Sequence, residues 1–216
     1  LISSSAFSAI SSSPVNPNAT DAAKKLYTFL YDNYGKKTIS GIMTGDNGTA
    51  GVLSEQPDVK ALLKLDGGVM PALIGFDFLM TTGKSENEGW FQNFSNNCVS
   101  MAMEFWGMGG IPAFCWHWKD PSHQIDDYKP DSVAPYWDFT KAFKSGTLEW
   151  NTSSDEYKYM MTDIDRVSDQ LLKMQKAGVA VLWRPLHEAA GQWFWWSAKT
   201  AKQYVALYKL MYDRMV

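Results

Sequence analysis

The chain has 216 residues, a formal net charge of −3 and a hydrophobic content of 45%, and these values allow one domain, or one and a half at most, with a substantial core. It contains no apolar run of about 18 residues that would span a membrane, and its mild acidity gives no electrostatic reason to expect a nucleic acid or an anionic membrane as a partner. Aromatic residues make up 14% of the chain, and ten tryptophans among them suit contact with carbohydrates.

The first segment, residues 1–19, is rich in serine and carries no charge. It lacks the basic region and the long apolar region of an intact signal peptide. Two interpretations therefore stay open, the tail of a processed signal peptide and a linker. The folded domain is expected over residues 20–216.

Helical and strand-like segments alternate along the rest of the chain. Thr20 is a good helix N-cap, and Gly35 ends the helix that follows it. Four short apolar segments have the character of buried strands, and they lie at 38–43, 71–78, 111–116 and 179–183. The helices predicted between and after them lie at 56–64, 90–106, 155–177 and 199–215. Near-continuous apolar strands that alternate with helices indicate an α/β fold with a parallel sheet.

Four strand–helix units are half of a (β/α)8 TIM barrel, and such barrels typically need about 250 residues. A half barrel leaves two sheet edges unpaired and its core open. We therefore predict that residues 20–216 hold roughly the first four units of a (β/α)8 barrel. We also expect that the chain is a fragment, or that a second segment completes the fold.

Residues capable of chemistry gather at the end of the fourth predicted strand. The apolar run 179–182 leads into Arg184, His187 and Glu188, and four aromatic residues beginning with Trp193 follow within eight positions. In parallel α/β folds, active sites are built at the carboxyl ends of strands. Aromatic rings beside a carboxylate offer a stacking surface for sugar rings.

Each of these features also has a purely structural interpretation. Arg184 alone is more often an ion-pair partner, His187 alone is more often a structural histidine, and a tryptophan cluster is more often part of a core. Glu188 is harder to explain in this way, because glutamate is almost never fully buried unless paired and here it is flanked by small and apolar residues. Together the four features favour a functional site.

The run Arg-Pro-Leu-His-Glu at 184–188, followed by Gly-x-Trp-Phe-Trp-Trp at 191–196, resembles the acid/base strand of family 26 glycoside hydrolases, chiefly β-mannanases. Gln192 and Ser197 differ from the residues usual in the family, which bears on fine specificity more than on chemistry. Further stretches that resemble the family lie at 14–20, 35–41 and 112–118, so that the resemblance covers about residues 14–216.

The resemblance implies a retaining, endo-acting hydrolase of β-1,4-mannosidic bonds in mannan, galactomannan or glucomannan. Glu188 would be the acid/base, and the nucleophile would be a glutamate on a seventh strand that is not in this chain. A proton donor that works near neutral pH needs a raised pKa, which burial beside aromatic residues supplies. We therefore expect Glu188 to be buried among the neighbouring tryptophans.

The resemblance also assigns the substrate-binding residues. Arg184 would pair with a catalytic carboxylate, and His187 would orient the sugar or the nucleophile through hydrogen bonds. His117, at the end of the third strand, would reach sugar hydroxyls, and Trp193 would pack under a sugar ring near the cleavage point. Asp77 ends the second strand, and we place it too far round the barrel to replace the missing nucleophile.

No cofactor and no metal are expected. The spacing of His117, His123 and His187 matches no common metal site, and the dipeptide His187-Glu188 lacks the second histidine of the zinc protease signature because position 191 is a glycine. The expected partner is a mannan polysaccharide, with no nucleic acid or membrane, and the C-terminal half of the barrel is needed in cis or as a second chain. Secretion is inferred from that polymeric substrate.

Two questions stay open at this point. The same residues on the same fold would also serve a β-1,3-1,4-glucanase or a xylanase, and a fragment that nothing completes would only bind carbohydrate. Cys98 and Cys115 are compatible with one disulfide or with two free buried thiols, and their geometry decides between these.

Overall fold

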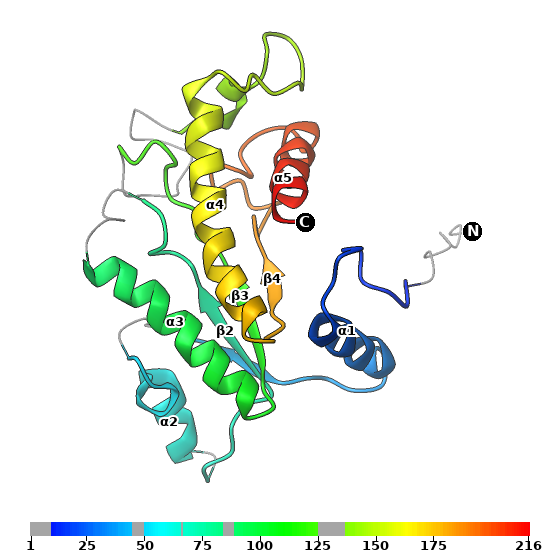
Figure 1. Ribbon diagram of the computed structural model, residues 1–216, viewed down its shortest axis with the longest axis vertical. Helices are drawn as coiled ribbons and strands as arrows, with labels where there is room; N and C mark the ends of the chain where they lie inside the picture. The colour runs from blue at the N-terminus through cyan, green and yellow to red at the C-terminus, as the bar shows by residue number, and fades with distance from the viewer. Residues whose placement is uncertain (1–9, 45–49, 66, 84–88, 125–136) are drawn as a thin grey trace.

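The computed structural model describes residues 10–44, 50–65, 67–83, 89–124 and 137–216. Part of the serine-rich segment, residues 1–9, and part of the loop after the third strand, residues 125–136, lie outside the described residues. The described residues contain one sheet of four parallel strands in the order β1-β2-β3-β4 (Figure 1). The strands are β1 Gly41–Met43, β2 Leu73–Asp77, β3 Ile111–Cys115 and β4 Leu182–Arg184.

The helices alternate with the strands as the sequence predicts. They are α1 Asp21–Asn33, α2 Pro57–Leu65, α3 Gly89–Gly107, α4 Asp155–Lys176 and α5 Ala201–Met215, with two short 3-10 helices, η1 Leu53–Glu55 and η2 Phe139–Ala142. Side chains at the N-caps start three of the long helices. Thr20, Ser154 and Thr200 accept hydrogen bonds from backbone N–H groups in the first turns of α1, α4 and α5.

The long helices α3 and α4 lie side by side on one face of the sheet, and α5 packs against α4 (Figure 1). Helix α1 covers a different part of the sheet. Its Leu26 packs with Ile111 and Ala180, which lie at the amino-terminal ends of β3 and β4. The helix therefore sits at the end of the strands opposite to the one where active sites form, and the carboxyl edge stays accessible.

The strand register brings chemically important residues together at that carboxyl edge. Asp77 of β2 pairs with Cys115 of β3, and Cys115 pairs with Arg184 of β4. Adjacent strands of a sheet lie about 4.7–4.9 Å apart. Residues that follow these three positions therefore emerge as neighbours.

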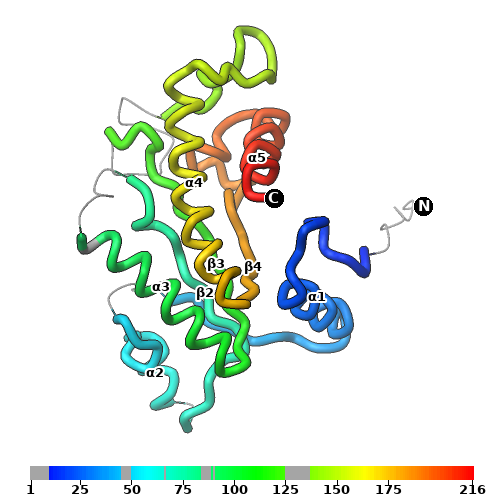
Figure 2. The backbone as a smooth tube through the Cα atoms, in the orientation of Figure 1, coloured from blue at the N-terminus to red at the C-terminus, as the bar shows by residue number. Residues whose placement is uncertain are grey.

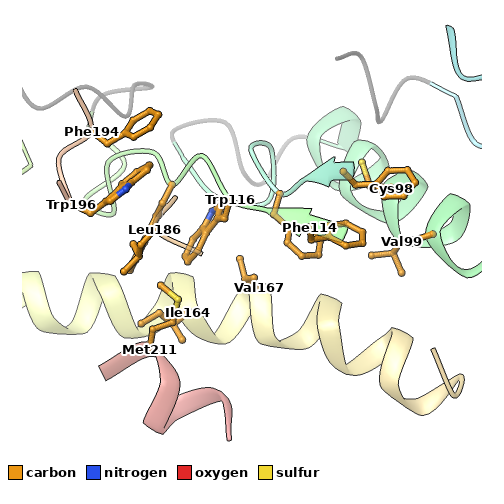
Figure 3. Close-up of a cluster of buried hydrophobic side chains, with 14 of the residues drawn as sticks. Cys98, Val99, Phe114, Trp116, Ile164, Val167, Leu186, Phe194, Trp196 and Met211 are labelled. Carbon is orange, nitrogen blue, oxygen red and sulfur yellow. The ribbon is translucent and has the colours of Figure 1, made fainter. Parts of the chain in front are cut away.

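The core lies between the sheet and the helices α3, α4 and α5. Phe114 of β3 and Trp116 just beyond it are fully buried, and they lie over Ile164 and Val167 of α4 (Figure 3). The indole rings of Trp116 and Trp118 stack with their centroids 4.1 Å apart, and both are fully buried. Neither ring is therefore available to a ligand.

Both cysteines are buried and free, which decides the open question against a disulfide. Cys98 lies on α3 and Cys115 ends β3. Burial raises the pKa of both thiols far above the ordinary value, so they stay protonated.

The backbone trace brings the beginning and the end of the described chain together (Figure 2). The Tyr212 hydroxyl donates to the carbonyl of Val15 at 3.3 Å, and the Asn18 side chain donates to the carbonyl of Val216 at 3.3 Å. Among the described residues, no helix is both long enough and apolar enough to cross a membrane.

Candidate active site

The loop that follows β4 has a strained backbone. Leu186, Glu188 and Gln192 have φ angles of 50°, 55° and 63°, in the left-handed region that non-glycine residues rarely adopt. Such a conformation costs about 1–3 kcal/mol for each residue and persists only where the surroundings impose it. Strain of this kind gathers at functional sites, so the loop is a candidate site on backbone grounds alone.

Hydrogen bonds from buried and half-buried aromatic side chains impose this conformation. The Trp196 indole donates to the carbonyl of His187 at 3.0 Å, and the Tyr204 hydroxyl donates to the carbonyl of Leu186 at 2.8 Å. The Trp195 indole donates to the carbonyl of Trp118 at 2.7 Å, which ties this loop to the loop after β3. These three aromatic residues hold the backbone so that Glu188 stands at the edge of the sheet.

Glu188 and Trp193 are both exposed on the surface of the loop. The Trp193 indole N–H donates to Glu188 Oε2 at 2.7 Å, and 54% of the Trp193 residue surface is exposed. Gly191 permits this approach, because a Cβ there would overlap the indole ring of Trp193. The predicted burial of Glu188 is wrong, because Glu188 is exposed. The three aromatic residues after Trp193 turn into the core, so they hold the loop from beneath and do not cover the carboxylate.

Two histidines meet next to this carboxylate. His117 follows β3, His187 precedes Glu188, and their Nε2 atoms are 3.1 Å apart. Their rings are nearly perpendicular with centroids 4.4 Å apart, and Phe194 packs against both of them. The structure thus brings together the two histidines that the sequence assigns to the site.

Asp77 is the residue that sequence reasoning missed. Its Oδ2 hydrogen-bonds Nδ1 of His117, and its Oδ1 accepts from the backbone N–H of His117 at 3.1 Å. The sequence-based prediction set Asp77 aside as a replacement for the missing nucleophile and gave it no other role, yet β2 and β3 are neighbours and Asp77 pairs with Cys115, two residues before His117. The signal was present in the sequence, since Asp77 is a carboxylate at the end of a buried strand next to the third strand.

The charges in this group depend on one another. Burial opposes a charge on His117, but the hydrogen bond and the negative charge of Asp77 outweigh it, and Glu188 adds to the effect, so the pKa of His117 lies above its ordinary value. Burial and the positive charge of His117 lower the pKa of His187. Burial also works against ionisation of Asp77, yet His117 lowers the pKa of that carboxyl. The site therefore favours a charged His117 beside a neutral His187.

Arg184 stands apart from this hydrogen-bonded group. It is exposed at the end of β4 and forms no ion pair with any residue in the described ranges. The predicted pairing of Arg184 with a catalytic carboxylate is thus not present among these residues. Its positive charge is nevertheless close enough to influence Cys115 and His187.

One set of side chains has the composition of a metal site. The ligand atoms of Asp77, Cys115 and His117 all lie within 4.8 Å of one another. A metal binds the cysteine thiolate, whereas the Cys115 thiol is kept protonated by burial and hydrogen-bonds Asp77. The three side chains satisfy one another, and their geometry is explained without an ion.

The third histidine of the sequence belongs to a different place. His123 Nε2 lies 2.9 Å from Oδ1 of Asp163, a fully buried carboxylate of α4 that also accepts from the Trp118 indole at 2.8 Å. It therefore does not gather with His117 and His187, and its role is to fasten the loop after β3 to α4.

Comparison with known proteins agrees with this architecture. A family model described as glycosyl hydrolase family 26 matches residues 15–216. The mannan endo-1,4-beta-mannosidase of Thermothelomyces thermophilus is 36% identical over 202 residues, which are 93% of this chain and 38% of that protein. Mannan endo-1,4-beta-mannosidase A of a Piromyces species is 35% identical, over 94% of this chain and 31% of its own.

Solved structures show the same relationship. A beta-mannanase from a symbiotic protist of the termite Reticulitermes speratus, solved in complex with a gluco-manno-oligosaccharide, is 42% identical with a TM-score of 0.80 and is matched over 96% of this chain and 61% of that one. The GH26-CBM35 beta-(1,4)-mannanase of Podospora anserina is 31% identical with a TM-score of 0.71, over 93% and 41%.

The chain thus spans between about a third and two thirds of the length of these relatives. The prediction of a partial (β/α)8 barrel is confirmed, because the family neighbours are such barrels and this chain supplies four adjacent parallel strands with their helices. With a match over residues 15–216 and a shared barrel architecture, the chain belongs to glycosyl hydrolase family 26.

Proposed function

We propose that the protein to which this chain belongs is a retaining endo-β-1,4-mannanase, with Glu188 as its acid/base. The observation that carries the proposal is the pair of Glu188 and Trp193, an exposed carboxylate and an exposed indole joined by a 2.7 Å hydrogen bond on a strained turn at the carboxyl end of β4. The names of the relatives, which are mannan endo-1,4-beta-mannosidases, supply the substrate class.

The geometry suits proton transfer by Glu188. The Trp193 N–H holds Oε2, which leaves Oε1 to carry the proton toward the glycosidic oxygen of a bound sugar. In the first step Glu188 gives that proton to the leaving group while a nucleophile attacks the anomeric carbon. In the second step the Glu188 carboxylate takes a proton from the water that hydrolyses the glycosyl-enzyme.

The nucleophile has to come from another strand. A retaining mechanism needs a second carboxylate about 5–5.5 Å from Glu188. Asp77 is unsuited to this role, because its oxygens already accept from His117, from the backbone N–H of Leu79 at 3.0 Å and from the Cys115 thiol. We place the nucleophile on the seventh strand of the barrel, supplied in cis or by a second chain.

The remaining residues of the site bind the substrate or a second carboxylate. Trp193 offers an exposed ring face to a mannose unit, and His117 and His187 lie within reach of hydroxyls at the same edge. Arg184, which has no ion-pair partner within the described part of the chain, offers its positive charge to a carboxylate of the completed barrel. The substrate is mannan, galactomannan or glucomannan, neither a nucleic acid nor a membrane is a partner, and we expect the protein to be secreted because a polymer cannot enter the cell.

Replacement of the acid/base tests the proposal. Glu188→Gln should lower the hydrolysis of mannan about 10²–10⁴-fold, because it removes the general acid, and it should lower the first step on an aryl mannoside with a good leaving group much less. The matched control is Glu149→Gln, since Glu149 is an exposed glutamate that pairs with Lys144 away from the site.

A second readout identifies the mechanism. In Glu188→Ala, azide should restore turnover, because it attacks the glycosyl-enzyme without a general base, and the product should be the β-mannosyl azide. Near-normal hydrolysis of mannan by Glu188→Ala would sink the acid/base assignment. Preference for mixed-linkage glucan or xylan over mannan would point to the glucanase or xylanase alternative, and binding without cleavage by the unmodified protein would point to a carbohydrate-binding role.

A further inference from the structure

A line of hydrogen bonds runs from β2 to the loop that carries Glu188. It starts at Asp77, passes through both ring nitrogens of His117 and ends at His187, the residue directly before Glu188. The proposed reaction gives Asp77 no role, although Asp77 is buried and lies at the active edge of the sheet. A buried carboxylate with this many donors around it sets the protonation of its neighbours.

The hydrogen-bond partners restrict where the protons lie. A carboxylate only accepts, so Nδ1 of His117 must carry a proton. At the 3.1 Å contact between the two Nε2 atoms, one ring donates and the other accepts. If His117 is a cation it donates, and neutral His187 then carries its proton on Nδ1. If His117 is neutral the direction reverses, and Nδ1 of His187 has no proton.

The charged groups around the pair favour the first arrangement. Asp77 on β2 and Glu188 on the loop are negative, Arg184 on β4 is positive and exposed, and the Cys115 thiol on β3 is neutral. The direct contact with Asp77 dominates, because it is a hydrogen bond and the charge of Arg184 is exposed to water. The pKa of His117 is raised and that of His187 is lowered, which agrees with a charged His117 and a neutral His187.

We propose that Asp77 is a positioning residue, which keeps His117 as an imidazolium and thereby fixes His187 as the tautomer with its proton on Nδ1, directly beside Glu188. Nδ1 of His187 is buried and has no hydrogen-bond partner among the described residues. A buried N–H without an acceptor is costly, so we expect the remaining part of the barrel to supply an acceptor for this proton, such as the second carboxylate. The effect on turnover rests on the proposed function, whereas the proton arrangement rests on the hydrogen-bond geometry and the surrounding charges.

Nitrogen NMR of the histidine rings in the full-length protein tests the proton arrangement without any activity measurement. Near neutral pH, His117 should show protons on both nitrogens and His187 a proton on Nδ1 only. In Asp77→Asn the amide faces Nδ1 of His117 as a donor, so His117 should become neutral with its proton on Nε2, and its titration midpoint should fall by about one to three pH units.

The matched control is Asp163→Asn, which makes the same change in the other buried aspartate that pairs with a histidine. It should leave the signals and titration of His117 and His187 unchanged. Should Asp77→Asn fail to fold, the unmodified protein still decides the matter. A neutral His117, or a His187 with its proton on Nε2, would overturn the proposal.

The pH dependence of mannohexaose cleavage tests the consequence. The donor form of His187 is lost as the pH rises through the raised pKa of His117, so kcat/KM should fall on the alkaline side. In Asp77→Ala this limb should move about one to three pH units lower, and kcat/KM at neutral pH should fall about tenfold or more. Asp77→Asn should lack the limb and keep more activity than Asp77→Ala, because neutral His117 still donates to His187.

The NMR measurement and the kinetic measurement together separate the failure of this inference from the failure of the proposed function. A protein that does not cleave mannan refutes the mannanase proposal, while the NMR result still decides the role of Asp77. A protein that cleaves mannan, with an alkaline limb that is identical in Asp77→Ala and in the unmodified protein, refutes the role of Asp77 alone.

Discussion

Among the described residues, two buried aspartates each hydrogen-bond a histidine, and the two pairs differ in the further contacts that are described for the histidine. Asp163 on α4 binds His123, the Trp118 indole and Arg166, and its group lies inside the protein beside a helix. Asp77 ends β2 and hydrogen-bonds one ring nitrogen of His117. The other ring nitrogen of His117 hydrogen-bonds His187, the residue directly before Glu188. The same pair of side chains joins a loop to a helix in one place and extends toward Glu188 at the active edge in the other.

The electrostatic difference follows from these surroundings. Burial raises the pKa of Asp163 even though three donors reach it, whereas His117 lowers the pKa of Asp77 against the effect of burial. The Asp163 group therefore fastens the loop after β3 to α4, and the Asp77 group maintains a charge at a strand end. A carboxylate–histidine pair indicates function only when the free side of the histidine faces other reactive groups.

Of the changes at the two aspartates, removal of the Asp163 carboxylate should have the largest effect on stability. Asp163→Ala leaves the Trp118 N–H and the His123 ring without their buried acceptor, so the free energy of unfolding should fall by about 3–5 kcal/mol. Urea denaturation measures this loss, and turnover per folded molecule should stay unchanged. A fall in turnover with intact stability would show that both aspartates serve catalysis and would remove the contrast between them.

The pH dependence of stability should separate the two pairs as well. The pKa of Asp77 lies below the ordinary 3.8, so its contribution is present above pH 3.8 and is lost as the pH falls through the lowered pKa. The pKa of His117 lies above the ordinary 6.5, so its contribution is present below pH 6.5 and is lost as the pH rises through the raised pKa. Asp77→Asn should therefore lower the free energy of unfolding most between about pH 4 and pH 6.5, by about 2 kcal/mol.

The pKa of Asp163 is shifted in the opposite direction from that of Asp77, so Asp163 serves as the comparison. Because its pKa is raised, its protonated form is favoured in the folded state, and its contribution declines as the pH rises from 3.8 through the raised pKa. Asp163→Asn should remove this decline in the free energy of unfolding. The losses of stability at acid pH, due to Asp77, and at alkaline pH, due to His117, should stay in place. Urea titrations at several pH values measure both profiles, and identical profiles for the two Asn variants would contradict the assigned directions.

The sequence predicted the order of elements well, because hydrophobic periodicity and helix caps are local signals. The helix predicted at 90–106 is observed as Gly89–Gly107, and the four predicted strands are the four observed strands, each shorter than predicted. The strand predicted at 179–183 is observed as Leu182–Arg184, because hydrogen bonding to β3 begins only at Leu182. Strand ends depend on pairing with another segment, which local sequence does not record.

The site was predicted only in part, for two physical reasons. The contact between Asp77 and His117 follows from neighbouring strands in a sequential sheet, but the order of the strands does not show which side chains hydrogen-bond across them. The exposure of Glu188 depends on left-handed backbone at Leu186, Glu188 and Gln192, and no local pattern announces this conformation in non-glycine residues. The same turns decide that Trp193 is exposed while Trp195 is buried.

The smallest expected effect on stability comes from a change at Trp193. Within the loop after β4, Trp193 and Trp195 differ in role as the two aspartates do. Trp193 is exposed and contacts Glu188, whereas Trp195 is buried and donates to the carbonyl of Trp118. Trp193→Ala should change the free energy of unfolding little, yet it should lower kcat/KM for mannohexaose about tenfold. Covering about 60 Å² of indole with a sugar contributes roughly 1.5 kcal/mol at about 25 cal/mol per Å².

Trp195→Ala is the matched variant, and it should cost about 3–5 kcal/mol of stability because it opens a cavity under the loop. Melting curves measured beside mannohexaose kinetics distinguish the two sides of the loop. If Trp193→Ala destabilised the protein as strongly as Trp195→Ala while turnover per folded molecule stayed constant, Trp193 would belong to the core and the sugar-binding face would have to lie elsewhere. The loop would then support only Glu188, and Arg184, which is exposed, would become the next candidate for contact with the substrate.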